Sequence, residues 1–371
     1  MERIYLDSAS TTQIYDSVKK EIDKTSSELY GNPSSLHLLG EKAMEKINLS
    51  RKKIAEKINA RPWEIIFTSG ATESNNLALR CIDAGRSRNI NIISSIEHPS
   101  VRETAKHLQK TGQGLLEIPV DKSGRIDIDF LRKELEKNRN KIRIVSVMHV
   151  NNILGVIQDI DEIGRLCRKN KVLFHTDAVQ SFGKIRIDVK KTGIDLLSAS
   201  AHKIGGPKGV GFLYAREGVK IWPLFHGGGQ ERGVRSGTEN TPGIAGFSKA
   251  VEEIGRINRK KIEKLKKKLI NGLGKIGAKI NSPEDGVSNI IHTSFPGFSG
   301  EEIVYRLSEK GIYVSSGSAC DSKKEKEDHV LKAIGLGKRE IAGSIRISLS
   351  EKNSEGDIEK IIKELSEILK I

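Results

Sequence analysis

The sequence predicts an α/β fold in which a large domain is built on a mostly parallel sheet flanked by helices and a smaller domain is of the α+β type. Short apolar segments alternate with amphipathic helical segments through the first two thirds of the chain, a rhythm that favours parallel strands covered on both faces. After Gly243 this rhythm gives way to a long basic segment followed by a few strands. The chain of 371 residues is also long for one compact domain, so two domains are expected.

Six apolar segments of the first part are predicted strands because they are short and rich in branched and aromatic residues. They read EIIFTS, INIISS, IRIVSVMHV, VLFHTD, IDLLSAS and GVGFLYA. A helix is expected over residues 36–58, packed on the large domain, because its apolar residues share one face. That face is formed by Leu39, Ala43, Ile47, Ile54 and Ile58.

The last third of the chain predicts the smaller domain. One long basic helix is expected from EEIGRINRKKIEKLKKKLINGLG, then strands from VSNIIHTSF and GSIRISL, and a closing helix over residues 357–369. Together with an N-terminal strand, these elements place the small domain at residues 1–15 and 256–371 and the large domain at 16–255. The small domain is expected to have a sheet of its own.

Composition narrows the classes of function. The first residues contain no signal-peptide pattern, and no apolar run approaches the roughly 20 residues that span a bilayer, so a cytoplasmic protein is expected. The net charge of +15 comes from Lys and Arg scattered among nearly as many acids. That distribution indicates solvated helix faces rather than a nucleic-acid surface. A nucleic-acid-binding or scaffold protein remains a distant alternative that rests on charge alone.

The three cysteines, Cys81, Cys167 and Cys320, include no CxxC pair, so neither a disulfide framework nor a zinc or redox motif is expected. Cys81 and Cys167 lie on the apolar side of helical patterns, where a cysteine acts as a small hydrophobe. Cys320 ends the small, polar stretch SSGSAC, in which a thiol can meet solvent and substrate. It is the candidate reactive cysteine.

Lys203 is the candidate for covalent chemistry. It follows a predicted strand in SASAHKIGGPKGVG, among small residues and glycines. A lysine in a partly closed site loses its proton readily and can form an imine with an aldehyde cofactor. The segment lacks the spacing and the Ser or Thr of a Walker nucleotide-binding loop.

Asp177 ends the predicted buried strand in VLFHTDAVQ. A buried carboxylate needs a positive partner, and a protonated pyridine nitrogen is one that would also turn the ring into an electron sink. Metal binding and helix capping are the alternatives. Gln180 follows three residues later, in reach of a ring hydroxyl.

FTSGATESNN predicts a strand, a tight turn and a helix start, with Ala71 and Thr72 at the turn. Unpaired backbone N–H groups and the helix dipole make such a start an anion site. The alternative is a plain helix cap by Thr72 and Glu73.

Ten motifs, in chain order, resemble those of the cysteine desulfurases, a branch of the class V aminotransferase group of pyridoxal-phosphate enzymes. They are DSASTT, GNPSSLH, SGATESNN, EHPSV, VNNILGV, HTDAVQ, SAHKIGGPKGVG, RSGTEN, SSGSAC and SIRISL. The resemblance spans nearly the whole chain and implies an aspartate-aminotransferase-like fold with a large sheet of the seven-stranded type. SSGSAC resembles the branch that serves nitrogenase and housekeeping iron–sulfur assembly.

The resemblance implies a role for each residue that matches a motif. The implied catalytic residues are Cys320, Lys203 and His98. The implied cofactor-binding residues are Ala71, Thr72, His98, Asn152, Asp177, Gln180, Ser200, Ala201, His202, Lys203 and Thr238. The implied substrate-binding residues are Asn32, Asn152 and Arg346.

In these roles Lys203 is the Schiff-base lysine, Asp177 pairs with the pyridine nitrogen and His98 stacks on the ring. Thr72, Ser200 and His202 hold the phosphate, Asn152 and Gln180 flank the ring oxygen, and Arg346 clamps the substrate carboxylate with help from Asn32. Thr238 reaches in from a second subunit, so the site is complete only in a homodimer. The plainer alternatives are a strand-end cap for His98 and a surface ion pair for Arg346.

The implied reaction converts L-cysteine to alanine. Lys203 takes the α-proton, Cys320 attacks the substrate sulfur, and the resulting persulfide passes to an acceptor such as an iron–sulfur scaffold or a tRNA-thiolating enzyme. A selenocysteine lyase, a kynureninase-like hydrolase or an aminotransferase of the same class is the alternative, and Cys320 discriminates against these. No metal site is assigned, although Cys320 is a possible iron–sulfur ligand. Two departures from the family pattern stand out: Ile153 replaces an acidic residue, and the charged DSKKEKED follows Cys320.

Overall fold

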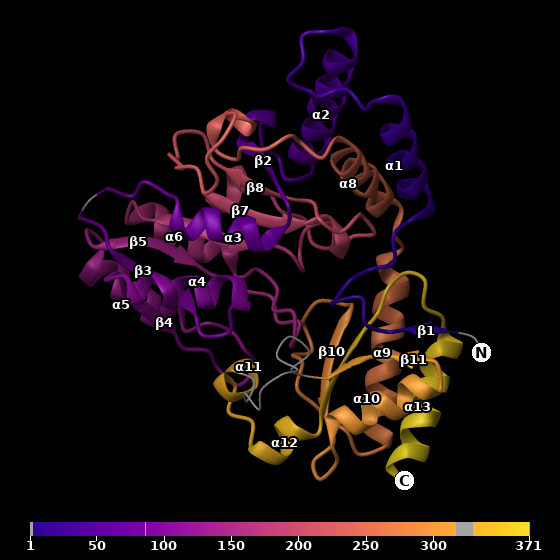
Figure 1. The fold of residues 1–371 in the computed structure, drawn as a ribbon. Helices are drawn as coiled ribbons and strands as arrows, with labels where there is room; N and C mark the ends of the chain where they lie inside the picture. Colours follow the sequence, from indigo (N-terminus) through magenta and orange to yellow (C-terminus); the bar gives the residue numbers. More distant parts are fainter. Residues whose placement is uncertain (1–2, 86, 317–328, 371) are drawn as a thin grey trace.

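The computed structural model describes residues 3–85, 87–316 and 329–370. The large part of the molecule is built on a seven-stranded sheet (Figure 1). Its strands are β2 (Ile65–Thr68), β3 (Ile90–Ser94), β4 (Gly114–Ile118), β5 (Ile142–Ser146), β6 (Leu173–Asp177), β7 (Leu196–Ser200) and β8 (Gly211–Ala215). The order is β2-β8-β7-β6-β5-β3-β4, and within it only β8 runs against its neighbours. The predicted mostly parallel sheet is confirmed, with β4 added at its edge.

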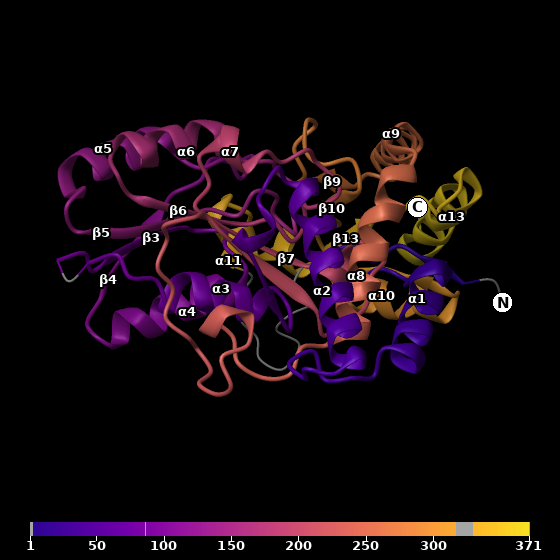
Figure 2. The same cartoon turned by 90° about the horizontal axis from the view of Figure 1, so that it is seen from above.

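Helices cover both faces of this sheet (Figure 2). They are α1 (Asp16–Glu28), α2 (Leu38–Lys57), α3 (Ala71–Arg80), α4 (Pro99–Lys110), α5 (Ile128–Asn138), α6 (Ile160–Lys169), α7 (Val189–Thr192) and α8 (Thr241–Glu253). In Figure 2, α3 and α4 lie on one face, and α5, α6 and α7 lie on the other. The helix expected over residues 36–58 is α2, which begins after His37 because the His37 side chain accepts from Gly40 N. Its residues Ile47, Ile54 and Ile58 enter the core as predicted.

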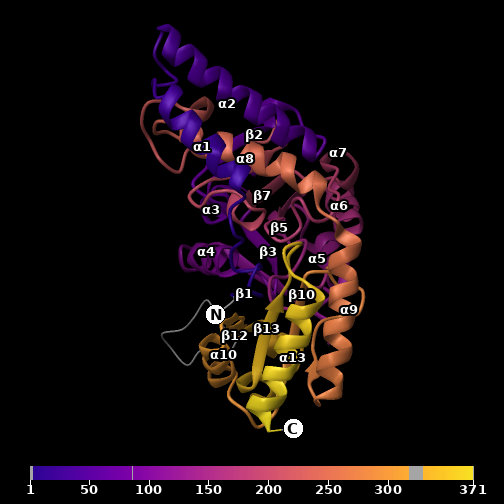
Figure 3. The ribbon, with the colours of Figure 1, turned by 90° about the vertical axis from the view of Figure 1, so that its right-hand side faces the viewer.

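The small part has its own sheets. Its strands are β1 (Ile4–Tyr5), β9 (Lys279–Ile280), β10 (Ile290–Ser294), β11 (Ile312–Tyr313), β12 (Ser315–Ser316) and β13 (Ser344–Ser348). Its helices are α9 (Arg259–Lys275), α10 (Gly300–Glu309), α11 (His329–Ala333), α12 (Lys338–Ala342) and α13 (Glu355–Leu369). One sheet has the order β12-β13-β10-β9, and β1 pairs in parallel with β11. Figure 3 shows α9 and α13 side by side over the larger of these sheets.

The single long basic helix expected after Gly243 is wrong. Helix α8 ends at Glu253, a short turn follows over Ile254–Arg256, and α9 begins at Arg259. The break arises because Asn258 caps α9, its side chain accepting from Lys261 N. Between these helices Ile257 is extended and packs against the cores of both parts.

The large apolar cores follow the division into two parts. Two of them pack on the two faces of the seven-stranded sheet, and another joins Ile4 and Leu6 to residues of α9, β10, β13 and α13. The division at 1–15, 16–255 and 256–371 stays a prediction, which these separate cores support. Among the described residues, no helix combines the length and apolar character needed to cross a bilayer.

Candidate active site

The parallel strands bring the predicted site residues to one edge of the large sheet. Asp177 is the last residue of β6, Ser200 is the last residue of β7, and Lys203 ends the short 3-10 turn that follows β7. Carboxyl ends of parallel strands share an edge, where α/β proteins build their sites. Helix α3 begins at Ala71, three residues after β2 ends at Thr68, and completes this edge.

Lys203 is held by the N-terminal segment, which crosses over from the small part. Its Nζ donates to Ala9 O at 2.7 Å and to Ser10 O at 2.8 Å. Gln180 Nε2 also donates to Ala9 O at 2.8 Å, and Gln180 Oε1 accepts from Lys184 Nζ at 2.9 Å. Burial, with the nearby charges of Lys203 and Arg346, lowers the pKa of Lys184 to about 7. One amine and one amide thus donate to the same backbone carbonyl, and a second amine donates to that amide.

Asp177 is buried, with only 3% of its surface exposed. Its Oδ2 accepts from Asn75 Nδ2 at 2.8 Å and its Oδ1 accepts from Val179 N at 3.0 Å. The residues that follow it form turns, so it caps no helix. Within the described ranges there is also no group of three or more His, Cys, Asp or Glu suited to a metal ion. These findings disfavour both alternatives for Asp177.

His98 lies at the start of α4, and its Nδ1 accepts from Ser100 N at 3.1 Å. Burial lowers the pKa of His98, an effect that the charge of Asp177 opposes and that of Lys203 reinforces. The imidazole is therefore neutral at neutral pH. The contact with Ser100 N makes His98 the N-cap of α4 rather than a strand-end cap, and it uses only one ring nitrogen.

The turn before α3 has the features of an anion site. Gly70 has a φ of 154°, which an L side chain rarely adopts, and a Cβ built there would lie 3.8 Å from Ser200 Oγ. Ala71 and Thr72 stand in the first turn of α3, where backbone N–H groups have no acceptor within the helix. Gly70, not Thr72, occupies the cap position, whereas Glu73 accepts from Ser69 N at 2.8 Å, so the plain-cap interpretation applies to Glu73 and not to Thr72.

His202 and Ala201 lie in the 3-10 turn beside this anion site. His202 Nδ1 and Thr11 Oγ1 are 3.1 Å apart, so the N-terminal segment also orients this imidazole. Burial and the charges of Lys203 and Lys208 lower the pKa of His202 to about 4. It is thus a neutral hydrogen-bonding group at neutral pH.

Arg346 on β13 is the cation that the resemblance assigns to the substrate carboxylate. Its guanidinium donates to Asn152 O at 3.0 Å, to Asp7 Oδ1 at 2.8 Å and to Ser10 Oγ at 2.5 Å. It is only 5% exposed, so the alternative of a surface ion pair is wrong. Its Nε is buried and has no hydrogen-bond partner among the described residues. A carboxylate could satisfy that donor.

Two described residues of the predicted set are not brought to this group. Asn32 is exposed in the loop between α1 and α2, where its Oδ1 accepts from Ser34 N at 2.9 Å. Figure 1 shows this loop at the opposite end of the molecule from β10 and the small part. Thr238 is exposed and lines a cavity of about 240 Å³ beside Thr68 and Ser69. Cys320 lies outside the described residues.

Ile153, which stands where the family pattern has an acidic residue, lies in an apolar environment. Its side chain packs against an apolar cluster formed by Ile96, Leu154, Val156, Val330, Leu331 and Ile334. That cluster joins the loop after β5 to α11. The neighbouring Asn152 uses its backbone carbonyl to hold Arg346.

Sequence reasoning missed several residues that complete the site. Asp7, Ser10, Asn75, Ser100 and Lys184 each contact a predicted site residue. Asp7 and Ser10 belong to the DSASTT motif, and Asn75 belongs to SGATESNN, but their roles depend on contacts between distant segments. Membership of those motifs was the feature of the sequence that could have indicated them as site residues.

Glu97, next to His98, is fully buried and accepts from Met148 N at 2.7 Å and from Ser94 Oγ. Burial raises its pKa to about 8 from 4.5. Between these pH values the folded state binds one more proton than the unfolded chain, so this carboxyl makes the free energy of unfolding fall as pH rises. The amide in Glu97→Gln mimics the protonated acid and does not titrate. The variant therefore lacks this decrease in the free energy of unfolding as pH rises.

The Glu97→Gln protein is therefore expected to gain stability relative to the native protein by about 1.4 kcal/mol per pH unit as pH rises through this window. Urea unfolding of both proteins between about pH 5 and 8 measures the difference. Glu103→Gln, on the exposed face of α4, is the control and is expected to show no such trend. Parallel stability curves for Glu97→Gln and the native protein would contradict the prediction.

Comparisons with known proteins place the chain in a family. The sequence matches the aminotransferase class-V family over residues 4–361. A relative from Methanosarcina thermophila, named cysteine desulfurase IscS, is 43% identical over 374 residues, covering 99% of this chain and 92% of the relative. A solved NifS-like protein has a TM-score of 0.91 at 40% identity, with 100% of each chain covered. A structure described as SspA in complex with cysteine has a TM-score of 0.84 at 36% identity, covering 95% of this chain and 100% of that one.

The fold is that of the class V aminotransferases. Over its whole length the chain belongs to the aminotransferase class-V family and, within it, to the cysteine desulfurases. The family resemblance read from the ten motifs is thereby confirmed.

Proposed function

We propose that this chain is a pyridoxal-phosphate-dependent cysteine desulfurase that converts L-cysteine to L-alanine and carries the sulfur as a persulfide on Cys320. The observation that carries the proposal is that Lys203 and buried Asp177 share one edge of the large sheet, where the N-terminal segment also holds buried Arg346 of β13. Lys203 and Arg346 are bridged by Ser10, whose carbonyl holds the amine and whose hydroxyl holds the guanidinium.

The residues present fit pyridoxal phosphate. Asp177 is a buried carboxylate suited to a pyridinium, and the glycine turn before Ala71 and Thr72 offers backbone N–H groups to a phosphate. Ser200 adjoins that turn, and Gln180 is held beside Lys203 through Ala9 O. When bound, the cofactor supplies an aldehyde that reacts with amines and a ring that withdraws electrons.

Residues of the chain itself carry out substrate binding, proton abstraction and sulfur transfer. Arg346 binds the substrate carboxylate, using the Nε that has no partner among the described residues. Lys203 takes the α-proton as general base. The Cys320 thiolate attacks the substrate sulfur, so a new S–S bond forms while the C–S bond breaks. The electron pair stays on the substrate carbon, which takes a proton and leaves as the methyl group of alanine.

The sulfur on Cys320 needs an acceptor, for which we propose a protein such as an iron–sulfur scaffold in the cytoplasm. The competing function is that of a related class V enzyme such as a selenocysteine lyase or an aminotransferase. Those reactions use Lys203 and Asp177 but need no reactive thiol. Cys320 in SSGSAC therefore favours the desulfurase.

The deciding experiment adds cysteine to the purified protein loaded with pyridoxal phosphate and assays alanine and sulfide together, with dithiothreitol present to release persulfide sulfur. The desulfurase forms both products in equal amounts. Alanine without sulfide or persulfide would contradict the proposal, and so would a protein that the cofactor fails to colour.

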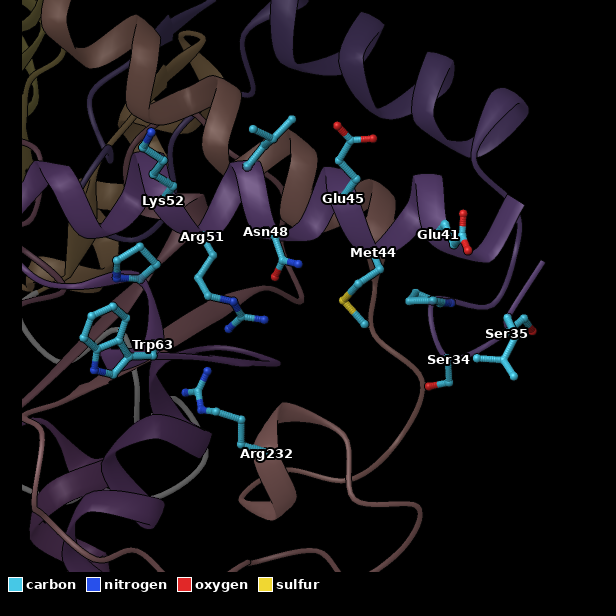
Figure 4. Close-up of a pocket in the computed structure, with 14 residues that line it drawn as sticks. Ser34, Ser35, Glu41, Met44, Glu45, Asn48, Arg51, Lys52, Trp63 and Arg232 are labelled. Carbon is cyan, nitrogen blue, oxygen red and sulfur yellow. The ribbon is translucent and has the colours of Figure 1, made fainter. Parts of the chain in front are cut away.

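We further propose that a second copy of this chain completes the site. A groove of about 830 Å³ lies along α2, and Figure 4 shows Arg51 pointing from this helix into the hollow toward Arg232. At its rim Leu36 is 95% exposed, and Leu38 close by is 72% exposed. Soluble proteins seldom leave several large apolar side chains together in water.

Asn32 lies next to this groove, and the loop that carries Thr238 also contributes to its lining. Asn32 directly precedes groove residues Pro33 and Ser34, and Thr238 lies in the same loop as Arg232. A second copy seated on this face gives both residues a site to enter, which supports the homodimer.

The dimer proposal predicts a solution mass of twice the 41.0 kDa chain. Charging the rim by Leu36→Glu with Leu38→Glu is expected to weaken association by at least about tenfold, because two carboxylates must then be buried. Sedimentation equilibrium measures the change. Tyr305→Glu, an exposed aromatic residue on α10 of the small part, is the matched control. A monomeric native protein would contradict the proposal.

Asp177→Asn tests the electron-withdrawing role. The change keeps the side chain's shape but removes the charge that would keep a pyridine nitrogen protonated. Cofactor is expected to bind while kcat falls by about a hundredfold, the scale of losing one preorganised electrostatic contact. Absorption and steady-state kinetics measure the two effects, and near-normal turnover would remove this assignment.

A further inference from the structure

A chain of hydrogen bonds connects the buried acid Asp177 to His98. Asn75 on α3 donates one Nδ2 hydrogen to Asp177 Oδ2 and the other to Ser100 Oγ, both at 2.8 Å. Ser100 Oγ lies 2.8 Å from His98 Nδ1. Asn75 is fully buried, and none of these contacts was expected from the sequence.

The direction of each hydrogen bond follows from one backbone group. The Ser100 N–H can only donate, and it donates to His98 Nδ1, so this nitrogen carries no proton. Ser100 Oγ must then donate to the same nitrogen and accept from Asn75. Since burial lowers the pKa of His98, the imidazole is neutral and its single proton lies on Nε2.

The Asn75 amide is oriented at an energetic cost. An ionised Asp177 can only accept, so it requires the amide nitrogen to face it. Asn75 Oδ1 is thereby left buried without a partner among the described residues, which destabilises the fold. A buried amide that spends both hydrogens on Asp177 and Ser100, and leaves its own oxygen unpaired, indicates a functional constraint.

We infer that Asn75 is a positioning residue that orients the Asp177 carboxylate and, through Ser100, locks His98 as the tautomer protonated on Nε2. His98 then meets the substrate as a hydrogen-bond donor rather than as a base, because its one lone pair is already occupied. The functional part of this inference rests on the proposed desulfurase activity, whereas the tautomer does not.

The tautomer is measured first, on the cofactor-free protein labelled with ¹⁵N-histidine. His98→Gln assigns the His98 signals among those of the nine histidines. We expect the Nδ1 signal of an unprotonated nitrogen and the Nε2 signal of a protonated one. A His98 signal pair with the proton on Nδ1 would overturn the inference, whether or not the loaded enzyme proves to be a desulfurase.

Two variants then test the individual hydrogen bonds between Asp177 and His98. Ser100→Ala keeps the backbone donor but removes the hydroxyl, so the Nδ1 signal should move while the pH midpoint of the bound cofactor's absorption stays unchanged. Asn75→Leu preserves volume and removes both donors, so both quantities should change, the midpoint by at least about half a pH unit. We also expect its kcat to fall at least about tenfold with KM nearly unchanged.

Asn76→Ala is the matched control, because Asn76 sits beside Asn75 on α3 but donates only to the backbone oxygen of Thr72. It should leave the His98 signals and the absorption midpoint as in the native protein. Thermal unfolding reports whether each variant folds. A folded Asn75→Leu protein with native His98 signals and a native midpoint would overturn the inference. If Asn75→Leu does not fold, the native tautomer and the Ser100→Ala signals decide it.

Discussion

Lys203→Ala is expected to lower kcat by more than about a thousandfold, because it removes both the amine that bonds to the cofactor and the general base. The other site residues should keep their positions in this variant. Asp177 and Gln180 keep their other partners, Asn75 and Lys184, in the variant. The bound cofactor should lose the absorption that depends on its bond to an amine of the protein, and borohydride should no longer fix it to the chain.

Peptide mapping after borohydride reduction makes this test specific. In the native protein the cofactor should be found on the peptide that contains Lys203. Lys184 is a stringent competitor, because its amine is linked to Lys203 through Gln180 and Ala9 and its pKa is lowered to about 7. Lys208→Ala, an exposed lysine five residues along the chain, is the control and should retain full activity. Cofactor fixed to Lys184 or Lys208 would contradict the assignment.

Cys320→Ser is expected to abolish persulfide formation and to lower alanine release by at least about a thousandfold. A thiol ionises near pH 8.5, whereas a serine hydroxyl stays protonated and attacks sulfur poorly. Because Lys203 and Asp177 are unchanged, the variant should still bind the cofactor and respond spectroscopically to cysteine. Loss of sulfur transfer with retained binding is the result that separates a desulfurase from the other enzymes of this fold.

The structure makes the location of the sulfur a clear test. Cys81 and Cys167 are buried, and burial raises the pKa of both thiols, so neither is a ready nucleophile. A peptide map after reaction with cysteine should find the added sulfur only with Cys320. Cys81→Ala is the control, expected to keep full activity. Full activity in Cys320→Ser, or sulfur found on another cysteine, would remove the main reason for proposing a desulfurase.

The sequence by itself determined the class of fold and predicted which polar residues share the sheet edge. Alternating apolar strands and amphipathic helices favour a parallel sheet, and polar residues at the ends of parallel strands must share an edge. Asp177 and Lys203 could therefore be assigned together from local patterns. The burial of Cys81 and Cys167 followed in the same way from their place on apolar helix faces.

Only the tertiary structure decided how those residues are held. The segment from Asp7 to Ser10 reaches Lys203 and Arg346 from the other end of the chain, and Asn75 meets Ser100 across two helices. No periodic pattern encodes such contacts, because they depend on how complete elements pack rather than on neighbours in the chain. The break before α9 also brings extended Ile257 against two cores at once, a contact that depends on the packing of both parts.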